Sequence, residues 1–397
     1  MTIRNTKKYA KSLAHPQAKW TILEGDCEAV LKTLPSNSID SVVTDAPYGM
    51  SRAANDPQQV AKIMQAWLNG NAPKISGCGY AGAEWDVLPP SPSIWREVFR
   101  VLKPGGYAAV FASSRTDDLT KLALRLAGFE INDTISFILK GGFPKYQDVG
   151  RALEKRLRKW GHHPDESHYE GQATFRNLRG NAFKKTLMRQ NTLKQIVAEV
   201  VEPSHDLSRK WMGYHTHLKS SHQPIVVGKK PVWSNVLDNV IRYGVGALNT
   251  DACAIPLPKN DNRLVSNLNS NASQKGRYPA NVVGDLGSEN EKYFVNATYY
   301  IGKRTLPKDR DEYMPAGEIN THPTCKTLDL MDWLTKLVTP TGGKILDPFA
   351  GSGSTGISAI RQGFEFVGIE LDCTYASIAK KRLEVCEKRH TKIKDAA

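Results

Sequence analysis

The tetrapeptide Asp45-Ala46-Pro47-Tyr48 joins a carboxylate, a rigid turn and an aromatic ring. A side-chain oxygen of Asp45 and the carbonyl of Ala46 can each accept one hydrogen of an amino group, which frees the nitrogen lone pair for attack. Pro47 fixes the turn through its locked φ, and Tyr48 offers a flat face on which an extruded base can stack. These four residues are therefore candidate catalytic residues for chemistry on a base amino group. A strand-end turn with an incidental tyrosine is the alternative interpretation.

A second motif is the stretch DPFAGSGST, which begins at Asp347. Its glycines, Gly351 and Gly353, allow the backbone to approach a ligand where a Cβ would clash. Glu370 follows at close to the offset of about 20 residues at which such acids meet ribose hydroxyls. Asp347 would repel a pyrophosphate but attract a sulfonium or amino group. The motif therefore favours S-adenosylmethionine as cofactor, with a purely structural tight turn as the alternative.

Both motifs follow short segments, residues 41–44 and 344–346, that the pattern predicts as strands, and the first of them lies in the largely apolar run 39–44. The chain on either side alternates between strand-like and helix-like segments, which is typical of a mainly parallel sheet covered by helices. Residues 51–92 are rich in Gly, Pro, Asn and Ala, and we expect loops to dominate there. The other expected strands are 20–24, 107–112, 131–139, 223–228 and 364–369, and the expected helices are 28–34, 93–102, 117–127, 235–243, 328–337 and 355–361.

The net charge of +14 is unevenly distributed. Residues 1–20 and 151–230 hold the whole excess of Lys and Arg, and the rest of the chain is balanced. This pattern indicates a polyanion-binding insertion on a neutral enzyme core, although a solvated basic face would look the same. Candidate phosphate contacts are Lys184, Lys185 and Arg189. The predicted organisation is a basic tail (1–20), a catalytic half (21–145), an inserted basic recognition region (146–220) and a cofactor-binding half (221–397).

Several classes of protein and site are disfavoured by composition. The six cysteines form no C-x-x-C pair, which argues against disulfide and zinc frameworks. The cluster at His162, His163, Asp165 and His168 has no standard ligand spacing, so we expect a polar loop and no metal. No apolar run reaches 18 residues and the first twenty residues lack a signal-peptide core. A cytoplasmic protein without membrane contact is predicted.

The sequence resembles the amino-group DNA methyltransferases that make N6-methyladenine or N4-methylcytosine, in the permuted arrangement called the β group. The matching stretches are EGDCEAVLKTLPSNSIDSVVTDAPYG, WREVFRVLKPGG, HPTCKTLDLMDWL, ILDPFAGSGSTG and FVGIELDCTYASIAKKRL. The further stretches GGFPK, LKSSHQPIVVGKKP, YGVGALNTDAC and GRYPANVV are similar to members common among phages and prophages.

This resemblance implies an α/β fold, a Rossmann-like class I methyltransferase with a seven-stranded, mostly parallel sheet and an inserted target-recognition region. The strands that end at Asp45 and Asp347 should then be neighbours at the switch point of the sheet. The implied cofactor is S-adenosylmethionine, and the implied partner is double-stranded DNA, with a homodimer as one assembly. The residues implied to surround the cofactor are Asp347, Phe349, Gly351 and Gly353, with Glu370 at the ribose, Asp26 near the adenine, and Thr324 and Lys326 beside the methionine portion.

Two residues depart from the family pattern. Ala46 and Thr327 each stand where the family usually has proline. Asp45 favours adenine by resemblance, so transfer to N6 of adenine is the predicted activity, with N4-cytosine transfer or a catalytically idle DNA-binding relative as alternatives. A nicotinamide dehydrogenase is disfavoured by the acid in the glycine turn. A C5-cytosine enzyme would need a cysteine nucleophile, usually in a Pro-Cys pair, and the chain has no such pair.

Overall fold

The computed structural model describes residues 19–73, 75–79, 82–139, 147–160, 203–218, 220–254, 278–284, 298–299 and 310–395. Contacts divide the chain into two units, one made of Met1–Lys140 and His222–Ala397 and the other of Gly141–Ser221. The recognition candidates Lys184, Lys185 and Arg189 lie outside the described residues, as does the cluster around His162.

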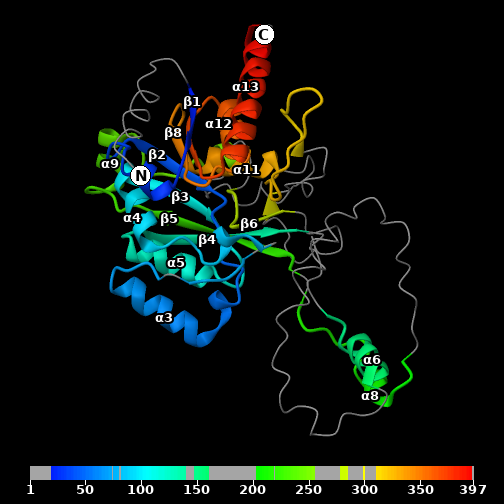
Figure 1. Cartoon of the computed structure of the whole chain (residues 1–397). Coiled ribbons are helices and arrows are strands. Elements are labelled where there is room, and N and C mark those ends of the chain that lie inside the picture. The colour runs from blue at the N-terminus through cyan, green and yellow to red at the C-terminus, as the bar shows by residue number, and fades with distance from the viewer. Residues whose placement is uncertain are drawn as a thin grey trace, which may run out of the picture. The chain divides into compact units, whose positions relative to one another are not determined.

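A single mixed sheet forms the centre of the larger unit (Figure 1). Its strand order is β1-β9-β8-β2-β3-β5-β4-β6-β7. Only β5 runs antiparallel to its neighbours, so the predicted mostly parallel sheet is confirmed. The strands are β1 (Trp20–Glu24), β2 (Ile39–Thr44), β3 (Leu102–Phe111), β4 (Glu130–Ile138), β5 (His222–Lys229), β6 (Val282–Gly284), β7 (Thr298–Tyr299), β8 (Lys344–Asp347) and β9 (Glu365–Glu370).

The expectation of seven strands is wrong for the described residues, which contain nine. The two additional strands, β6 and β7, have three and two residues and lie at the β4 edge. Segments this short carry too few alternating positions to produce a period-two signal in the sequence.

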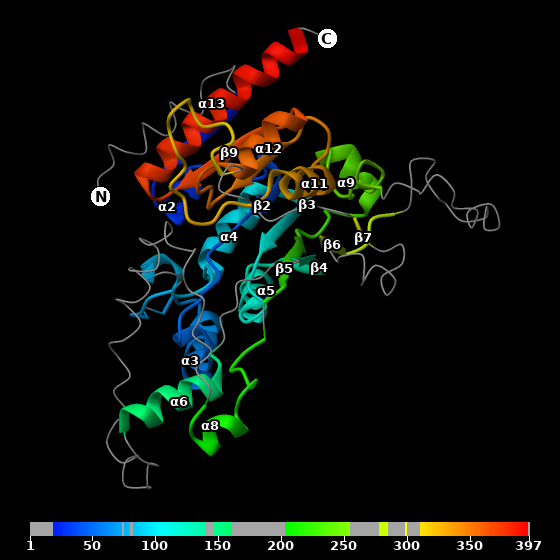
Figure 2. The same cartoon turned by 90° about the vertical axis from the view of Figure 1, so that its right-hand side faces the viewer.

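Helices cover both faces of the sheet in the larger unit (Figure 2). Successive residues of β2 show why the sequence requires two layers, because Val42 packs into one apolar cluster and Val43 into the other, and both are fully buried. The described helices of this unit are α2 (Cys27–Leu31), α3 (Pro57–Leu68), α4 (Pro92–Val101), α5 (Asp117–Leu126), α9 (Val236–Tyr243), α11 (Leu328–Val338), α12 (Ser354–Gln362) and α13 (Cys373–Asp395), with short 3-10 turns at Ala53–Asn55, Glu84–Asp86 and Asp251–Cys253.

Helix α3 corrects the expectation that loops dominate residues 51–92. Asp56 accepts backbone N–H hydrogen bonds from Gln58 and Gln59 and so caps the helix, with Pro57 in its first turn. Ile63 and Trp67, four residues apart, are buried. The cap signal was present in the sequence, but the surrounding Gly, Asn and Pro residues obscured it.

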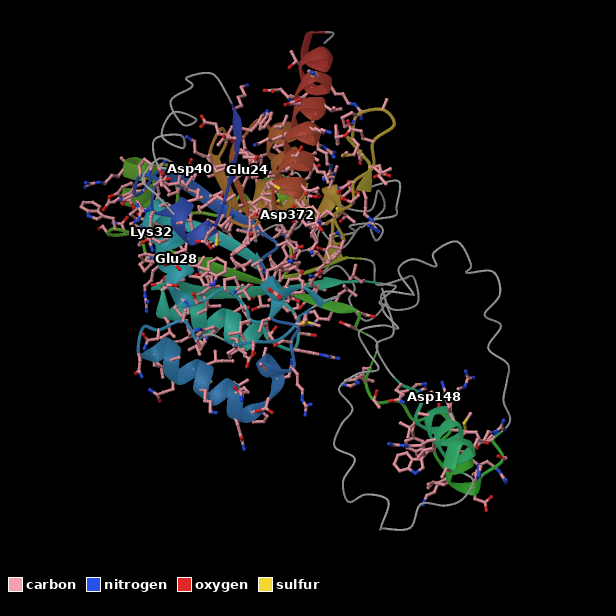
Figure 3. The ribbon with its side chains drawn as sticks, viewed as in Figure 1. Glu24, Glu28, Lys32, Asp40, Asp148 and Asp372 are labelled. Atoms are coloured by element: carbon pink, nitrogen blue, oxygen red, sulfur yellow. The ribbon has the colours of Figure 1, made fainter. Side chains whose placement is uncertain are left out.

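Asp40, labelled in Figure 3, fastens the three central strands near their beginnings. Its carboxylate accepts hydrogen bonds from Lys103 Nζ at 2.5 Å and from the Lys344 backbone N–H at 2.7 Å. This carboxylate joins β2 to both of its neighbours, β3 and β8. The opposite ends of β2 and β8 are thereby placed side by side.

The smaller unit contains α6 (Val149–Trp160) and α8 (Asp206–Lys210). Glu154 of α6 is almost fully buried and accepts hydrogen bonds from the backbone N–H groups of Ser204 and His205. These bonds fasten the segment that leads into α8 onto α6. None of the helices in the described ranges is long and apolar enough to cross a membrane.

Candidate active site

The two predicted motifs meet at the carboxyl ends of two neighbouring central strands, β2 and β8. Strands β2 and β8 are parallel neighbours in the register Ser41↔Ile345 and Val42↔Leu346. The hydroxyl of Thr44 donates a 2.6 Å hydrogen bond to Oδ1 of Asp347. The prediction that the strands ending at Asp45 and Asp347 are neighbours is therefore confirmed.

The Asp45 carboxylate is held by two donors. Tyr48 donates its hydroxyl hydrogen to Oδ1 at 2.5 Å, and Lys326 Nζ donates to Oδ2. Lys326 Nζ also donates to the Tyr48 hydroxyl oxygen at 3.0 Å, and Gln223 Nε2 donates to the same oxygen. Because the phenol accepts from both neighbours, its single hydrogen points to Asp45. Lys326 was expected beside the cofactor, and the structure brings its ammonium group to the Asp45 carboxylate.

Tyr48 stays protonated in this environment. Burial, reinforced by the nearby Asp45 carboxylate, raises the pKa of Tyr48 well above its usual value. Ala46 is also buried, with 3% of its surface exposed in the apolar cluster that includes Trp95. Ala46 therefore anchors the tetrapeptide in the core, while the Asp45 carboxylate lies at the carboxyl end of β2.

Asp347 holds the glycine turn through both of its carboxylate oxygens. Its Oδ1 accepts from the Thr44 hydroxyl and from the Phe349 backbone N–H at 3.0 Å, and its Oδ2 accepts from the Thr355 hydroxyl at 2.6 Å. Burial raises the pKa of Asp347 to about 6, against the opposing effect of these hydrogen bonds. Both oxygens are thus used to connect β2, β8 and the first turn of α12.

Glu370 also holds this turn, through the backbone N–H of Gly351. Its Oε2 accepts from the Gly351 backbone N–H at 2.7 Å, and its Oε1 accepts from the Asp372 backbone N–H at 2.9 Å. Burial raises the pKa of Glu370. Each carboxylate oxygen keeps a further lone pair, so both can still accept a hydroxyl hydrogen.

Gly351 has φ +52°, and a Cβ on it would lie 2.8 Å from Nε2 of His322. The backbone conformation and the close ring both require glycine at this position. Gly353, with φ +80°, directly precedes α12. The structure therefore requires glycine at both positions for the conformation of the turn, and their approach to a ligand stays a prediction.

The structure gives contacts for two further predicted cofactor residues, Asp26 and Phe349. Asp26 caps α2 through a 3.0 Å hydrogen bond from the Ala29 N–H. It follows β1, the strand that pairs with β9, so it stands at the same sheet edge as Glu370. Phe349 packs edge to face against Trp95 with ring centroids 6.4 Å apart.

His322 is a site residue that the sequence reasoning did not single out. Its Nδ1 accepts from the Thr324 backbone N–H at 3.3 Å, and its ring lies edge to face with Tyr375 at 4.6 Å. Burial lowers the pKa of His322 to about 4, so the ring is neutral at neutral pH. The only signal was its place at the start of the HPTCK stretch, because one histidine has no periodicity.

This histidine gives the protein a measurable pH dependence. The pKa is about 6.5 unfolded and about 4 folded, so only the unfolded chain gains this proton between those values. The free energy of unfolding is fully retained above pH 6.5 and decreases as the pH falls, by about 2 kcal/mol at pH 5 from this group. Urea unfolding at pH 7.5 and 5 should show this loss in the parent but not in His322→Gln. An equal loss in both proteins would assign it to other groups.

Within the described residues, no three His, Cys, Asp or Glu side chains are arranged to hold a metal ion.

Arg382 of α13 is a buried cation beside the site, with 1% of its surface exposed. It donates to the carbonyl of Ser352 at 2.7 Å and, through Nε, to the carbonyl of Glu312 at 3.1 Å. It therefore supports the glycine turn through the carbonyl of Ser352.

One protein family matches most of the chain. The family N6_N4_Mtase, described as DNA methylase, matches residues 39–381. The type II methyltransferase M.HindIII of Haemophilus influenzae is 23% identical over 384 residues, which cover 92% of this chain and 95% of that protein. M2.DpnII of Streptococcus pneumoniae is 48% identical over 63 residues, or 16% of this chain, and the match spans only about a quarter of that relative's length. Among solved structures, the chain is similar to the PvuII DNA methyltransferase (cytosine-N4-specific), with 14% identity and a TM-score of 0.46. The match covers 94% of this chain and 90% of the PvuII enzyme.

Proposed function

Because the chain belongs to the N6/N4 family of DNA methylases, we propose that it methylates the exocyclic N6 of adenine in double-stranded DNA. The proposed cofactor, S-adenosylmethionine, supplies a methyl group on a sulfonium. The observation that carries the proposal is the meeting of Asp45 with the glycine turn at the ends of two paired strands. An acceptor for amino hydrogens and a nucleotide-binding turn thereby serve one reaction centre.

The residues around the glycine turn fit an adenosyl group. Glu370 and Asp26 are carboxylates at the ends of neighbouring strands, and Gly351 has no side chain to obstruct the turn. Glu370 would accept the ribose hydroxyls through its remaining lone pairs, and Asp26 would lie near the adenine. Thr324 and Lys326 would flank the methionine portion, where Lys326 also contacts Asp45.

The arrangement of donors on Asp45 suggests how the amino group is activated. The carboxylate already orders two donors, Tyr48 and Lys326, and an incoming amino group would replace one of them. The carbonyl of Ala46 would accept the second amino hydrogen. As the nitrogen–carbon bond forms and the carbon–sulfur bond breaks, the nitrogen loses one proton, and Asp45 is the nearest carboxylate to receive it. Tyr48 would stack against the flipped base.

N4-cytosine is the second candidate target, because the N6_N4_Mtase family is named for both amino groups. Asp45 rather than serine at the first position favours adenine by resemblance. The test is mass spectrometry of nucleosides from DNA treated with the protein and cofactor. N6-methyladenine supports the proposal, N4-methylcytosine supports the second candidate, and no methylated base would indicate an idle DNA-binding relative.

Replacing Glu370 tests the ribose assignment. The variant Glu370→Ala should weaken cofactor binding by about 1 to 3 kcal/mol, because a charge-assisted hydrogen bond is lost. Titration calorimetry measures the change. Glu365→Ala is the matched control, since this acid begins the same strand and pairs with Lys344 at 2.9 Å. Equal affinity in the two variants would show that the βαβ unit uses a different acid.

We propose that the smaller unit contributes target recognition. The aromatic side chains of Trp211 and Tyr214 lie edge to face at 5.0 Å and are exposed at 39% and 58%. The neighbouring helices carry Arg151, Lys155, Arg156, Arg158, Arg209 and Lys210. Exposed rings among cations suit a nucleic acid, because the cations neutralise phosphates and the rings can stack on bases.

We also propose a homodimer formed through α9. Most of its apolar side chains face outward, with Leu237 76% and Ile241 85% exposed, whereas its fully buried residue is the polar Asn239. Asp238 and Arg242 follow the two exposed residues on one flank, so two antiparallel copies would bring Asp238 of each to Arg242 of the other. Asn239 donates to the Pro104 carbonyl at the beginning of β3, the sheet edge opposite to Asp45. DNA access would therefore be preserved.

The dimer proposal predicts that the mass in solution is twice the mass of one chain. Light scattering after gel filtration should give twice the chain mass for the parent and the single-chain mass for Leu237→Lys with Ile241→Lys, because lysines abolish the apolar face. Leu68→Lys, at an exposed end of α3, is the matched control and should leave the dimer intact. A monomeric parent would refute the proposal.

A further inference from the structure

We infer that Asp86, which lies outside every motif of the sequence, positions the catalytic turn. Its side chain is 98% buried, since 2% of its surface is exposed. Oδ1 accepts the backbone N–H groups of Tyr48 at 2.8 Å and Gly49 at 2.9 Å. The inference rests on the proposed methyl transfer and assigns a residue to the geometry of that same site.

A second buried side chain holds the other side of Tyr48. The hydroxyl of Thr116, a fully buried residue, donates to the Tyr48 carbonyl at 2.5 Å. With Asp86 on the N–H groups, the polar backbone groups of Tyr48 are bound in both directions. The position of the Tyr48 ring, and with it the hydroxyl that orders Asp45, therefore depends on Asp86 and Thr116.

The chain around Asp86 is packed closely onto the turn. Gly49 has φ +69°, and a Cβ on it would lie 2.3 Å from Cδ of Pro89. A Cβ on Gly79 would lie 2.0 Å from the carbonyl oxygen of Asp86. Gly49 therefore allows the segment before α4 to lie directly against the turn, and Gly79 allows the backbone to pass close to Asp86. The site of Asp86 is thus built by the local backbone and is not a chance contact.

The hydrogen bonds that Asp86 accepts offset a deficiency of the turn itself. Ala46 leaves one more φ angle free than the proline usual in the family, so the tetrapeptide is less rigid by its covalent structure. Three hydrogen bonds from buried side chains restrict the residues that follow. A displacement of about 1 Å at a reaction centre can cost about 100-fold in rate. Asp86 and Ala46 should therefore be energetically coupled.

The test compares Asp86→Ala with Asp86→Asn, each with and without Ala46→Pro. Asp86→Ala should lower single-turnover methyl transfer about 100-fold at saturating cofactor and DNA, with the cofactor Kd changed less than twofold. Asp86→Asn keeps an acceptor oxygen and should lose less than tenfold. Ala46→Pro should restore about tenfold in Asp86→Ala and give a smaller gain in the parent.

Asp56→Ala is the matched control, because Asp56 caps α3 and likewise accepts two backbone N–H groups, at 3.0 and 3.1 Å, but none from the catalytic turn. It should leave methyl transfer within twofold. Hydrogen exchange gives a readout that needs no activity: Asp86→Ala should expose the amides of Tyr48 and Gly49, whereas Asp56→Ala should expose those of Gln58 and Gln59.

Two results would overturn the inference. The first is an Asp86→Ala protein that keeps parental turnover and parental protection at Tyr48. The second is a parallel loss of stability, cofactor affinity and turnover that Ala46→Pro does not relieve, which would make Asp86 a general structural residue. If the parent itself fails to methylate DNA, the proposed function fails, and the amide protection at Tyr48 still decides whether Asp86 holds the turn.

Discussion

Asp45→Ala is expected to abolish methyl transfer, with a loss of roughly 10³-fold or more, while cofactor binding persists. The variant removes the carboxylate that accepts the amino hydrogen and leaves the glycine turn intact, since the braces of that turn are Asp347 and Glu370. Transfer of a labelled methyl group in a single turnover measures the first effect, and titration calorimetry measures the second.

Asp45→Asn separates hydrogen bonding from charge. Its amide oxygen still accepts a hydrogen, but the neutral group no longer pairs with Lys326 and cannot take up a proton. We expect an activity between those of the parent and Asp45→Ala. Near-normal transfer in Asp45→Ala would refute the catalytic assignment, and a collapse of cofactor affinity would indicate that Lys326 had moved into the cofactor site.

The second large effect is expected from removing the smaller unit. Replacing residues 139–221 by Asn-Gly should reduce affinity for target DNA by about 10³-fold or more, the usual ratio between specific and non-specific binding. The excision is feasible because Ile138 pairs directly with His222 in the antiparallel β4·β5 ladder. A two-residue Asn-Gly turn closes such a hairpin without changing the register.

Binding as a function of salt identifies what the unit contributes. The slope of log affinity against log salt should become shallower by about 0.9 for each phosphate contact removed. Trp211→Ala is the companion variant: it should relax sequence preference while leaving the slope unchanged, because a ring carries no charge. The shortened protein should retain cofactor affinity within twofold. If it is folded and binds duplex DNA with parental affinity and slope, recognition lies elsewhere in the chain.

The central strands could be predicted because their residues carry the signal locally. The run 41–44 places Val42 on one face and Val43 on the other, as a strand between two helical layers requires, and the structure buries all four residues. Asp45 and Asp347 could be paired from the resemblance, although they lie far apart in the chain. Helix α13 was not predicted from periodicity, because its polar residues obscure its apolar face.

The support of the catalytic turn could not be predicted in this way. Asp86 acts through backbone N–H groups, which every sequence has, so no partner residue type announces the contact. Gln223 reaches Tyr48 from the beginning of β5, and Lys326 reaches Asp45 from the segment before α11. These contacts depend on the order of the strands in the sheet, which the local pattern leaves open.

The hydrogen bonds of Asp347 couple the stability of the catalytic strand β2 to that of the glycine turn. Thr44 belongs to the strand that delivers the catalytic aspartate, and Thr355 belongs to the helix that follows the glycine turn. A fluctuation that loosens the turn also removes the partner of Thr44, so the two segments should open as one cooperative unit. A ligand that closes the turn then rigidifies the catalytic strand before any base arrives. Cofactor first and DNA second is the binding order that this connection favours.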